Sequence, residues 1–211
     1  MTEFYKTFSA TFIFLIFLPS LFAFAGFGQT TQPPDCRKKF SLCKASEYTR
    51  IIELNPTDAM AYWNRGLAYH IEKKYDEAIS DFSRVVELDP KFPDIYRWRG
   101  TAYWVKKEYD WSITDFNKAI ELDPKDAASY YGRGASYHSK NNYDMAVADY
   151  NKAIELDSDH WVYYYVRGWL YYNIGKKSLA EANFKKAKEL ENSEENRNDV
   201  KSVQPTYPQF P

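Results

Sequence analysis

Arginine and aspartate residues recur along the chain at one fixed spacing. Four arginines lie 34 residues apart: Arg65, Arg99, Arg133 and Arg167. The residues 16 positions after them are Asp81, Asp115, Asp149 and Asn183. Because a guanidinium and a carboxylate form charge-assisted hydrogen bonds, the constant offset predicts an ion pair in each of the first three units. The alternative is a row of guanidinium groups facing a ligand's acidic groups, which the aspartates disfavour because they would neutralise that row.

Residue types that support metal or covalent chemistry are scarce. The chain has three histidines and two cysteines, and His70 and His138 lie two of these periods apart, too far for ligands of one zinc ion. The sequence contains no nucleophile elbow, phosphate-binding loop or zinc-hydrolase motif. We therefore expect no enzymatic activity, no cofactor and no metal. A formal net charge of −1 gives no electrostatic basis for binding nucleic acid.

The same period of 34 organises most of the 211 residues. Leu-Asn-Pro56, Leu-Asp-Pro90 and Leu-Asp-Pro124 recur at this interval and define four units, whose residues we number from position 1: 59–92, 93–126, 127–160 and 161–194. Positions 4, 8 and 11 share one face of a first helix, and positions 20, 24 and 27 share one face of a second. Proline at position 32 ends the second helix. The pattern predicts an all-α chain of antiparallel helix pairs.

These recurring residues resemble the tetratricopeptide repeat (TPR) family. They are Tyr62, Tyr96, Tyr130 and Tyr164 at position 4; Gly66, Gly100, Gly134 and Gly168 at position 8; and Phe82, Phe116, Tyr150 and Phe184 at position 24. Tyr replaces the family's usual Trp at position 4, and Arg replaces its Leu at position 7. The resemblance implies an α-solenoid of four helix-turn-helix repeats. Tyr48, Ile51 and Leu54 fit the second half of a preceding unit, so residues 38–58 are expected to form an N-terminal capping helix.

The resemblance also implies where a partner would bind. In TPR proteins, partners usually lie in a concave groove against first-helix positions 2, 5, 9 and 12. Positions 5 and 12 of this chain hold aromatic, histidine and arginine residues, of types frequent at binding hot spots: Trp63, His70, Arg97, Trp104, Tyr131, His138, Tyr165 and Tyr172. The alternative is that some of these rings pack between neighbouring first helices. Trp98, at position 6, is expected to pack between repeats.

A well-known TPR ligand mode grips the acidic C-terminus of heat-shock chaperones with lysine, arginine and asparagine side chains. The corresponding residues here are Trp63, Leu67, Trp98, Ala128 and Gly132, or, one unit later, Arg97, Thr101, Gly132, Val162 and Val166. Neither register provides this clamp. We therefore expect a protein-interaction scaffold that binds an apolar or proline-containing segment. The alternative is an exported carbohydrate- or polymer-binding protein that stacks sugar rings on the same aromatics.

The two ends of the chain differ from the repeats. Residues 1–25 combine an apolar run with Ala23-x-Ala25 and indicate a signal peptide, or alternatively an uncleaved signal anchor; residues 26–37 are a predicted linker. A secreted or periplasmic location is expected, with membrane anchoring as the alternative. Whether Cys36 and Cys43 form a disulfide stays open. Residues 195–211 are a predicted disordered tail with proline at every third position from Pro205.

Overall fold

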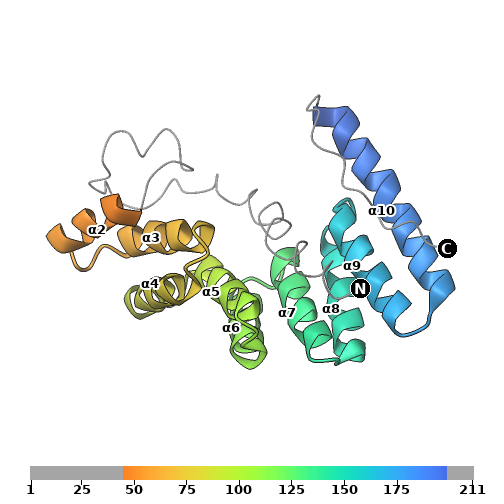
Figure 1. Cartoon of the computed structure of the whole chain (residues 1–211), viewed down its shortest axis with the longest axis horizontal. Coiled ribbons are helices and arrows are strands. Elements are labelled where there is room, and N and C mark those ends of the chain that lie inside the picture. Colours follow the sequence, from red (N-terminus) through yellow and green to blue (C-terminus); the bar gives the residue numbers. More distant parts are fainter. Residues whose placement is uncertain (1–44, 199–211) are drawn as a thin grey trace.

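The computed structural model describes residues 45–198, which form a series of α-helices without a strand. The helices are α2 (Ala45–Leu54), α3 (Ala59–Ile71), α4 (Tyr75–Leu88), α5 (Pro93–Val105), α6 (Tyr109–Leu122), α7 (Ala127–Ser139), α8 (Tyr143–Leu156), α9 (Trp161–Asn173) and α10 (Lys177–Asn198). They follow one another in pairs along an arc, with α3 and α5 on its inner side and α4 and α6 on its outer side (Figure 1). The predicted all-α solenoid is confirmed.

Small residues let the two helices of each pair approach closely. A Cβ atom on Gly66 would lie 2.6 Å from the Phe82 ring, and Ala78 on α4 is fully buried. Gly132 plays the same part between repeats, since its Cβ would lie 2.2 Å from the Phe116 ring of the preceding unit. The aromatic ring at position 24 therefore occupies the space that a side chain on the glycine would need.

Local signals set the helix ends. Asp58 and Asp126 cap α3 and α7, as their places before the first helices predict, by accepting hydrogen bonds from the backbone N–H groups of Ala61 and Ala128. Pro93 begins α5, where its fixed φ suits the first turn. Each turn from first to second helix passes through a residue with positive φ at position 15: Lys73, Lys107, Asn141 and Gly175.

The first and last described helices differ from the inner ones. α2 corresponds to a second helix, and Leu54 at its end is 81% exposed, whereas the equivalent leucines of later units are partly or fully covered. α10 continues to Asn198, so the first residues of the expected tail are helical. Within residues 45–198 no helix combines the length and the apolar character needed to cross a bilayer. The expected signal segment, linker, cysteines and proline-containing end lie outside the described residues.

Candidate functional site

The repeated arginines and aspartates meet in the structure. Arg99 donates two hydrogen bonds to Asp115, from Nε at 2.8 Å and from Nη2 at 2.7 Å. Arg65 and Asp81, and likewise Arg133 and Asp149, adopt the same two-pronged geometry. The aspartate side chains are only 5–6% exposed. Each pair joins the first and second helices of one repeat, so each aspartate compensates the charge of its arginine.

Each arginine also contacts the preceding repeat, which the sequence reasoning missed. The Nη1 group donates to a short polar side chain 16 residues earlier, on the previous second helix: Thr49, Ser83, Asn117 or Asn151. The guanidinium carbon lies 5.5–5.8 Å from the centre of the position-4 tyrosine ring. One arginine therefore ties three helices together. The recurrence of Thr, Ser or Asn at position 25 was the available signal.

The fourth unit keeps this arrangement without its negative charge. Arg167 Nε donates to Asn183 at 2.9 Å, and burial lowers the pKa of Arg167. In the second unit, burial raises the pKa of Asp115, and the Arg99 guanidinium opposes that rise. The neutral Asn183 amide accepts the hydrogen bond but does not compensate the positive charge of Arg167. Of the four arginines, Arg167 therefore has the least favourable electrostatic surroundings.

The N-terminal half of the predicted groove is packed. Trp63 and His70 are 5% and 6% exposed. The Trp98 ring lies edge-on to both, at centroid distances of 6.4 and 5.3 Å, so it packs between repeats as predicted. Trp63 also contacts Phe82 and Phe92. These two proposed groove residues thus belong to the core between the first and second repeats, which is the alternative considered above for some of the rings.

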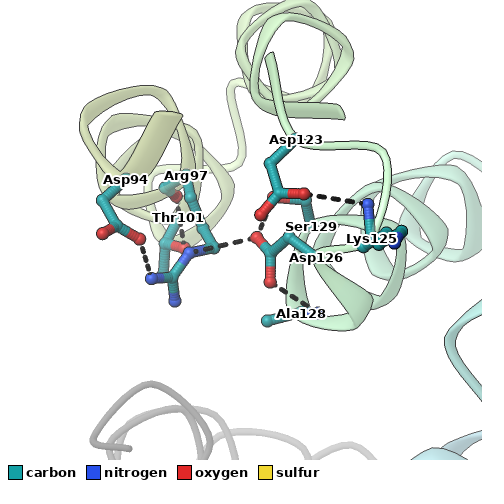
Figure 2. Close-up of polar contacts among 8 residues, drawn as sticks. All are labelled: Asp94, Arg97, Thr101, Asp123, Lys125, Asp126, Ala128 and Ser129. Carbon is teal, nitrogen blue, oxygen red and sulfur yellow. Dashed lines mark hydrogen bonds and ion pairs between the residues drawn. The ribbon is translucent and has the colours of Figure 1, made fainter. Parts of the chain in front are cut away.

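Arg97 lies in a compensated polar cluster between α5 and α7 (Figure 2). Its side chain is 3% exposed and forms ion pairs with Asp94 on its own helix and, at 3.3 Å, with Asp126. Asp126 in turn caps α7 and accepts a hydrogen bond from the Ser129 hydroxyl at 2.6 Å. Thr101 donates to the Arg97 carbonyl oxygen at 2.8 Å. Two carboxylates therefore face the Arg97 guanidinium and more than compensate its charge. The sequence pattern did not reveal the link to Asp126.

Position 12 contacts position 13 of the next first helix. Trp104 Nε1 donates to the Ser139 hydroxyl at 3.2 Å, and His138 Nε2 and Asn173 Nδ2 lie 3.4 Å apart. Both contacts span 35 residues. The same offset from His70 leads to Val105, whose hydrocarbon side chain cannot form a hydrogen bond. Both ring nitrogens of His70 consequently lack a hydrogen-bond partner.

The remaining predicted groove residues differ in exposure. Tyr165 is 4% exposed and packs edge-on against Trp169 and Phe184. Tyr131 is half-buried; its ring lies 5.5 Å from that of Tyr163, and burial raises its pKa. The half-buried position-12 residues Trp104, His138 and Tyr172 form a row on α5, α7 and α9.

No group of three or more His, Cys, Asp and Glu side chains within residues 45–198 is arranged to hold a metal ion. Burial lowers the pKa of His70 to about 4 and also lowers that of His138. Both imidazoles are therefore neutral at physiological pH.

Known families and structures match the repeats. Models described as tetratricopeptide repeat match residues 47–80, 127–160 and 162–194, and a model described as TPR repeat matches residues 68–107 and 105–140. No curated protein matches the chain.

Several solved structures have the same fold. A crystal structure of MamA shares 26% sequence identity, with a TM-score of 0.67 over 72% of this chain and 89% of its own. MamA from Desulfovibrio magneticus RS-1 shares 21%, with a TM-score of 0.66 over 71% and 84% of the two chains. The first TPR of Spaghetti (RPAP3), solved with the HSP90 peptide SRMEEVD, shares 25%, with a TM-score of 0.54 over 55% and 92%. Together, the models cover more than half of the chain, and the helix pairs have the architecture of these neighbours. The chain belongs to the tetratricopeptide repeat family.

Proposed function

We propose that this chain is a non-catalytic scaffold that binds an extended segment of a partner protein along the inner side of its solenoid. The observation that carries the proposal is the row of half-buried rings at position 12 on three consecutive first helices: Trp104, His138 and Tyr172. Helix pairing rests on positions 8, 20 and 24 and does not require these rings. Solenoids of stacked helix pairs use their extended concave surfaces for binding.

A protein or peptide partner is supported by the family. The RPAP3 domain, 25% identical to this chain, was solved with a bound peptide. Interaction scaffolds are the usual role of tetratricopeptide repeats. Protein recognition therefore accounts for the fold and for the aromatic row together.

The chemistry of the groove favours an apolar or proline-containing segment over an acidic C-terminus. Arg97, the position-5 cation, is buried and ion-paired with Asp94 and Asp126, so its charge is compensated before any ligand binds. The half-buried rings offer flat apolar surfaces of the kind on which proline-containing segments dock. The residues of the two-carboxylate clamp are missing from both registers.

A comparison of two peptide probes tests this function. One probe has the acidic sequence SRMEEVD, and the other has the proline-containing sequence of residues 204–211 of this chain. We expect the proline-containing probe to bind the full chain at least about tenfold more tightly in fluorescence anisotropy titrations, a difference of about 1.4 kcal/mol. The double variant Trp104→Ala/Tyr172→Ala should weaken that binding, because it removes two rings of the row.

The control variant is Glu87→Ala, which alters an exposed side chain on the second helix α4 and should leave peptide binding unchanged. Tighter binding of SRMEEVD would contradict the apolar groove. Binding of a polysaccharide that is lost in the Trp104→Ala/Tyr172→Ala variant would instead favour the carbohydrate-binding alternative.

The proposal also includes export of the protein from the cytoplasm. The apolar run and Ala23-x-Ala25 support a cleaved signal peptide and a secreted or periplasmic protein. N-terminal sequencing of the mature protein tests this directly. A new N-terminus near Gly26 is expected, whereas an intact Met1 on membrane-bound protein would indicate the signal anchor.

A further inference from the structure

A hydrogen bond between two first helices holds the polar edge of one ring at position 12. Trp104 on α5 donates from Nε1 to the Ser139 hydroxyl on α7, over 3.2 Å. That hydroxyl has a single hydrogen, which it donates to the Ala135 carbonyl oxygen at 2.9 Å. Ser139 is therefore the acceptor of the indole N–H, and an indole has no other polar atom. This contact uses the whole hydrogen-bonding capacity of the Trp104 ring within the chain.

The same pairing recurs one repeat later in a looser form. His138 Nε2 on α7 and Asn173 Nδ2 on α9 lie 3.4 Å apart, which is longer than an ordinary hydrogen bond. In both cases the partner of the ring is the residue at position 13 of the next first helix. Trp104 and Ser139 form the tighter pair, so the inference is drawn for them.

The first helices do not need a polar residue at position 13 in order to pack. Between α3 and α5 this position holds Val105, and the two helices meet through the edge-on contact of Trp98 with His70. The ring at position 12 is there the buried His70, which belongs to the core. Where position 13 is Ser139 or Asn173, the preceding ring is only half-buried. A polar residue at position 13 thus accompanies the rings that a ligand can reach.

We propose that Ser139 is a positioning residue of the binding surface, which fixes the Trp104 ring before the partner segment binds. This inference rests on the proposed function. A side chain that is already held in place loses little rotamer freedom on binding, and such a loss otherwise weakens affinity. Because its N–H is bound to Ser139, the ring also offers a ligand no hydrogen-bond donor. That favours an apolar or proline-containing segment over a sugar, whose hydroxyl groups need partners.

The first test is a double-mutant cycle in the full chain, with the proline-containing probe of residues 204–211. Ser139→Ala removes the acceptor, and Trp104→Phe removes the indole N–H but keeps an aromatic ring. We expect Ser139→Ala to weaken probe binding about threefold to tenfold in fluorescence anisotropy titrations. In the Trp104→Phe background the same substitution should change the affinity by less than about twofold, because no N–H is left to hold.

Two further variants separate positioning from a general effect of the substitution. Ser139→Thr keeps the hydroxyl and should retain the affinity of the parent chain. Thr114→Ala is the matched control and should leave probe binding unchanged. Thr114 is exposed on the second helix α6, and its hydroxyl donates to the carbonyl oxygen of Asp110, four residues earlier, as the Ser139 hydroxyl donates to that of Ala135.

A second measurement needs no ligand. In isotopically labelled protein, the Trp104 indole N–H resonance is the one that disappears from the NMR spectrum of Trp104→Phe. Ser139→Ala should shift this resonance and speed its exchange with solvent, whereas Thr114→Ala should do neither.

The outcomes distinguish this inference from the proposed function. Equal probe affinities of the parent chain and Ser139→Ala would overturn the role of Ser139 and leave the proposed function intact. An equal loss of affinity in the Trp104→Phe background would do the same, because the effect would then not pass through the indole N–H. A probe that binds the parent chain no more tightly than SRMEEVD does would overturn the proposed function, and with it the binding role of Ser139.

Discussion

At the scale of single residues, the arginine at position 7 joins three helices. Its Nε and Nη2 groups bind the aspartate of its own repeat, and Nη1 binds the repeat before it. Removing one member of a buried ion pair leaves the other member desolvated and without its partner. The stability of the solenoid should therefore depend strongly on the aspartates that face these arginines.

Replacing Asp115 by alanine should lower the free energy of unfolding by about 3–5 kcal/mol, because Arg99 would stay buried without a counter-charge. The matched control is Asp110→Ala on the same helix, whose side chain is 85% exposed, compared with 5% for Asp115. Its ion pair with Lys140 lies at the surface and should contribute less than about 1 kcal/mol. Urea unfolding of both variants measures the difference; equal stabilities would refute the buried-pair interpretation.

The burial of His70 predicts that the stability of the folded chain depends on pH. Burial lowers its pKa to about 4 in the folded chain, whereas an unfolded histidine titrates near 6.5. The unfolded state binds more protons between these values, so the stability that His70 provides is complete above pH 6.5 and falls as the pH drops toward 4. The loss is on the order of 3 kcal/mol.

The variant His70→Phe should remove this part of the pH dependence while keeping an aromatic ring beside Trp98. Val105→Asn should reduce it, because asparagine copies Asn173, which lies next to His138 at the same 35-residue offset. Thermal unfolding at several pH values between 4 and 7 compares the three proteins. A pH slope that is the same in all three would mean that His70 is not the group responsible.

At the scale of elements, the turn between the two helices of each repeat takes one left-handed residue. Three repeats use Lys73, Lys107 and Asn141, with φ between 60° and 64°, and the fourth uses Gly175 at 79°. Side chains disfavour this conformation by about 1–2 kcal/mol. A Cβ on Gly175 would meet no atom within 4 Å. A substitution there therefore causes no steric clash and measures only the cost of the left-handed backbone conformation.

Gly175→Ala should accordingly destabilise the chain by about 1 kcal/mol. Lys107→Ala is the matched control, since this position already carries a side chain in the same conformation and should respond little. Denaturant midpoints of the two variants give the comparison. A larger effect at Lys107 than at Gly175 would contradict the argument from backbone strain.

At the scale of the whole molecule, the last described helix, α10, presents a polar face at the end of the stack. In α8, Val147 and Ile154 are partly buried against the neighbouring repeat. The equivalent residues of α10 are Glu181 and Lys188, both exposed. Charged residues thus occupy the face on which another repeat would stack, and a polar outer face of this kind keeps a solenoid soluble.

The variant Glu181→Val/Lys188→Ile should make the chain associate end to end, because it restores the apolar contact surface of an inner repeat. Light scattering at increasing concentration should show a rising mass. Glu189→Ala serves as the control, since it changes an exposed residue of the same helix without adding a large apolar group. A variant that stays the size of the parent chain would show that other residues of α10 close the stack.

The sequence predicted those parts of the fold that depend on residues recurring in every repeat. The helix pairs follow from residues that return every 34 positions, and the contact between Arg99 and Asp115 follows from a constant offset. The groove was less predictable, because the contacts that bury His70 and Arg97 do not recur from one unit to the next. The burial of His70 depends on Trp98, which no other unit has at position 6, and that of Arg97 on Asp126. Such contacts require knowing which faces of neighbouring repeats meet.

The position-7 arginine also bears on how such a chain can change its length during evolution. Its two polar partners lie 16 residues before it and 16 residues after it, so all three fall within one period of the repeat. After a duplication or deletion of 34 residues, each position-7 arginine would still find a polar acceptor 16 residues before it and another 16 residues after it. Recombination between units can therefore lengthen or shorten the solenoid without breaking this joint. The contact of Arg97 with Asp126, in contrast, lies within the single unit 93–126, and the other units have no arginine at position 5.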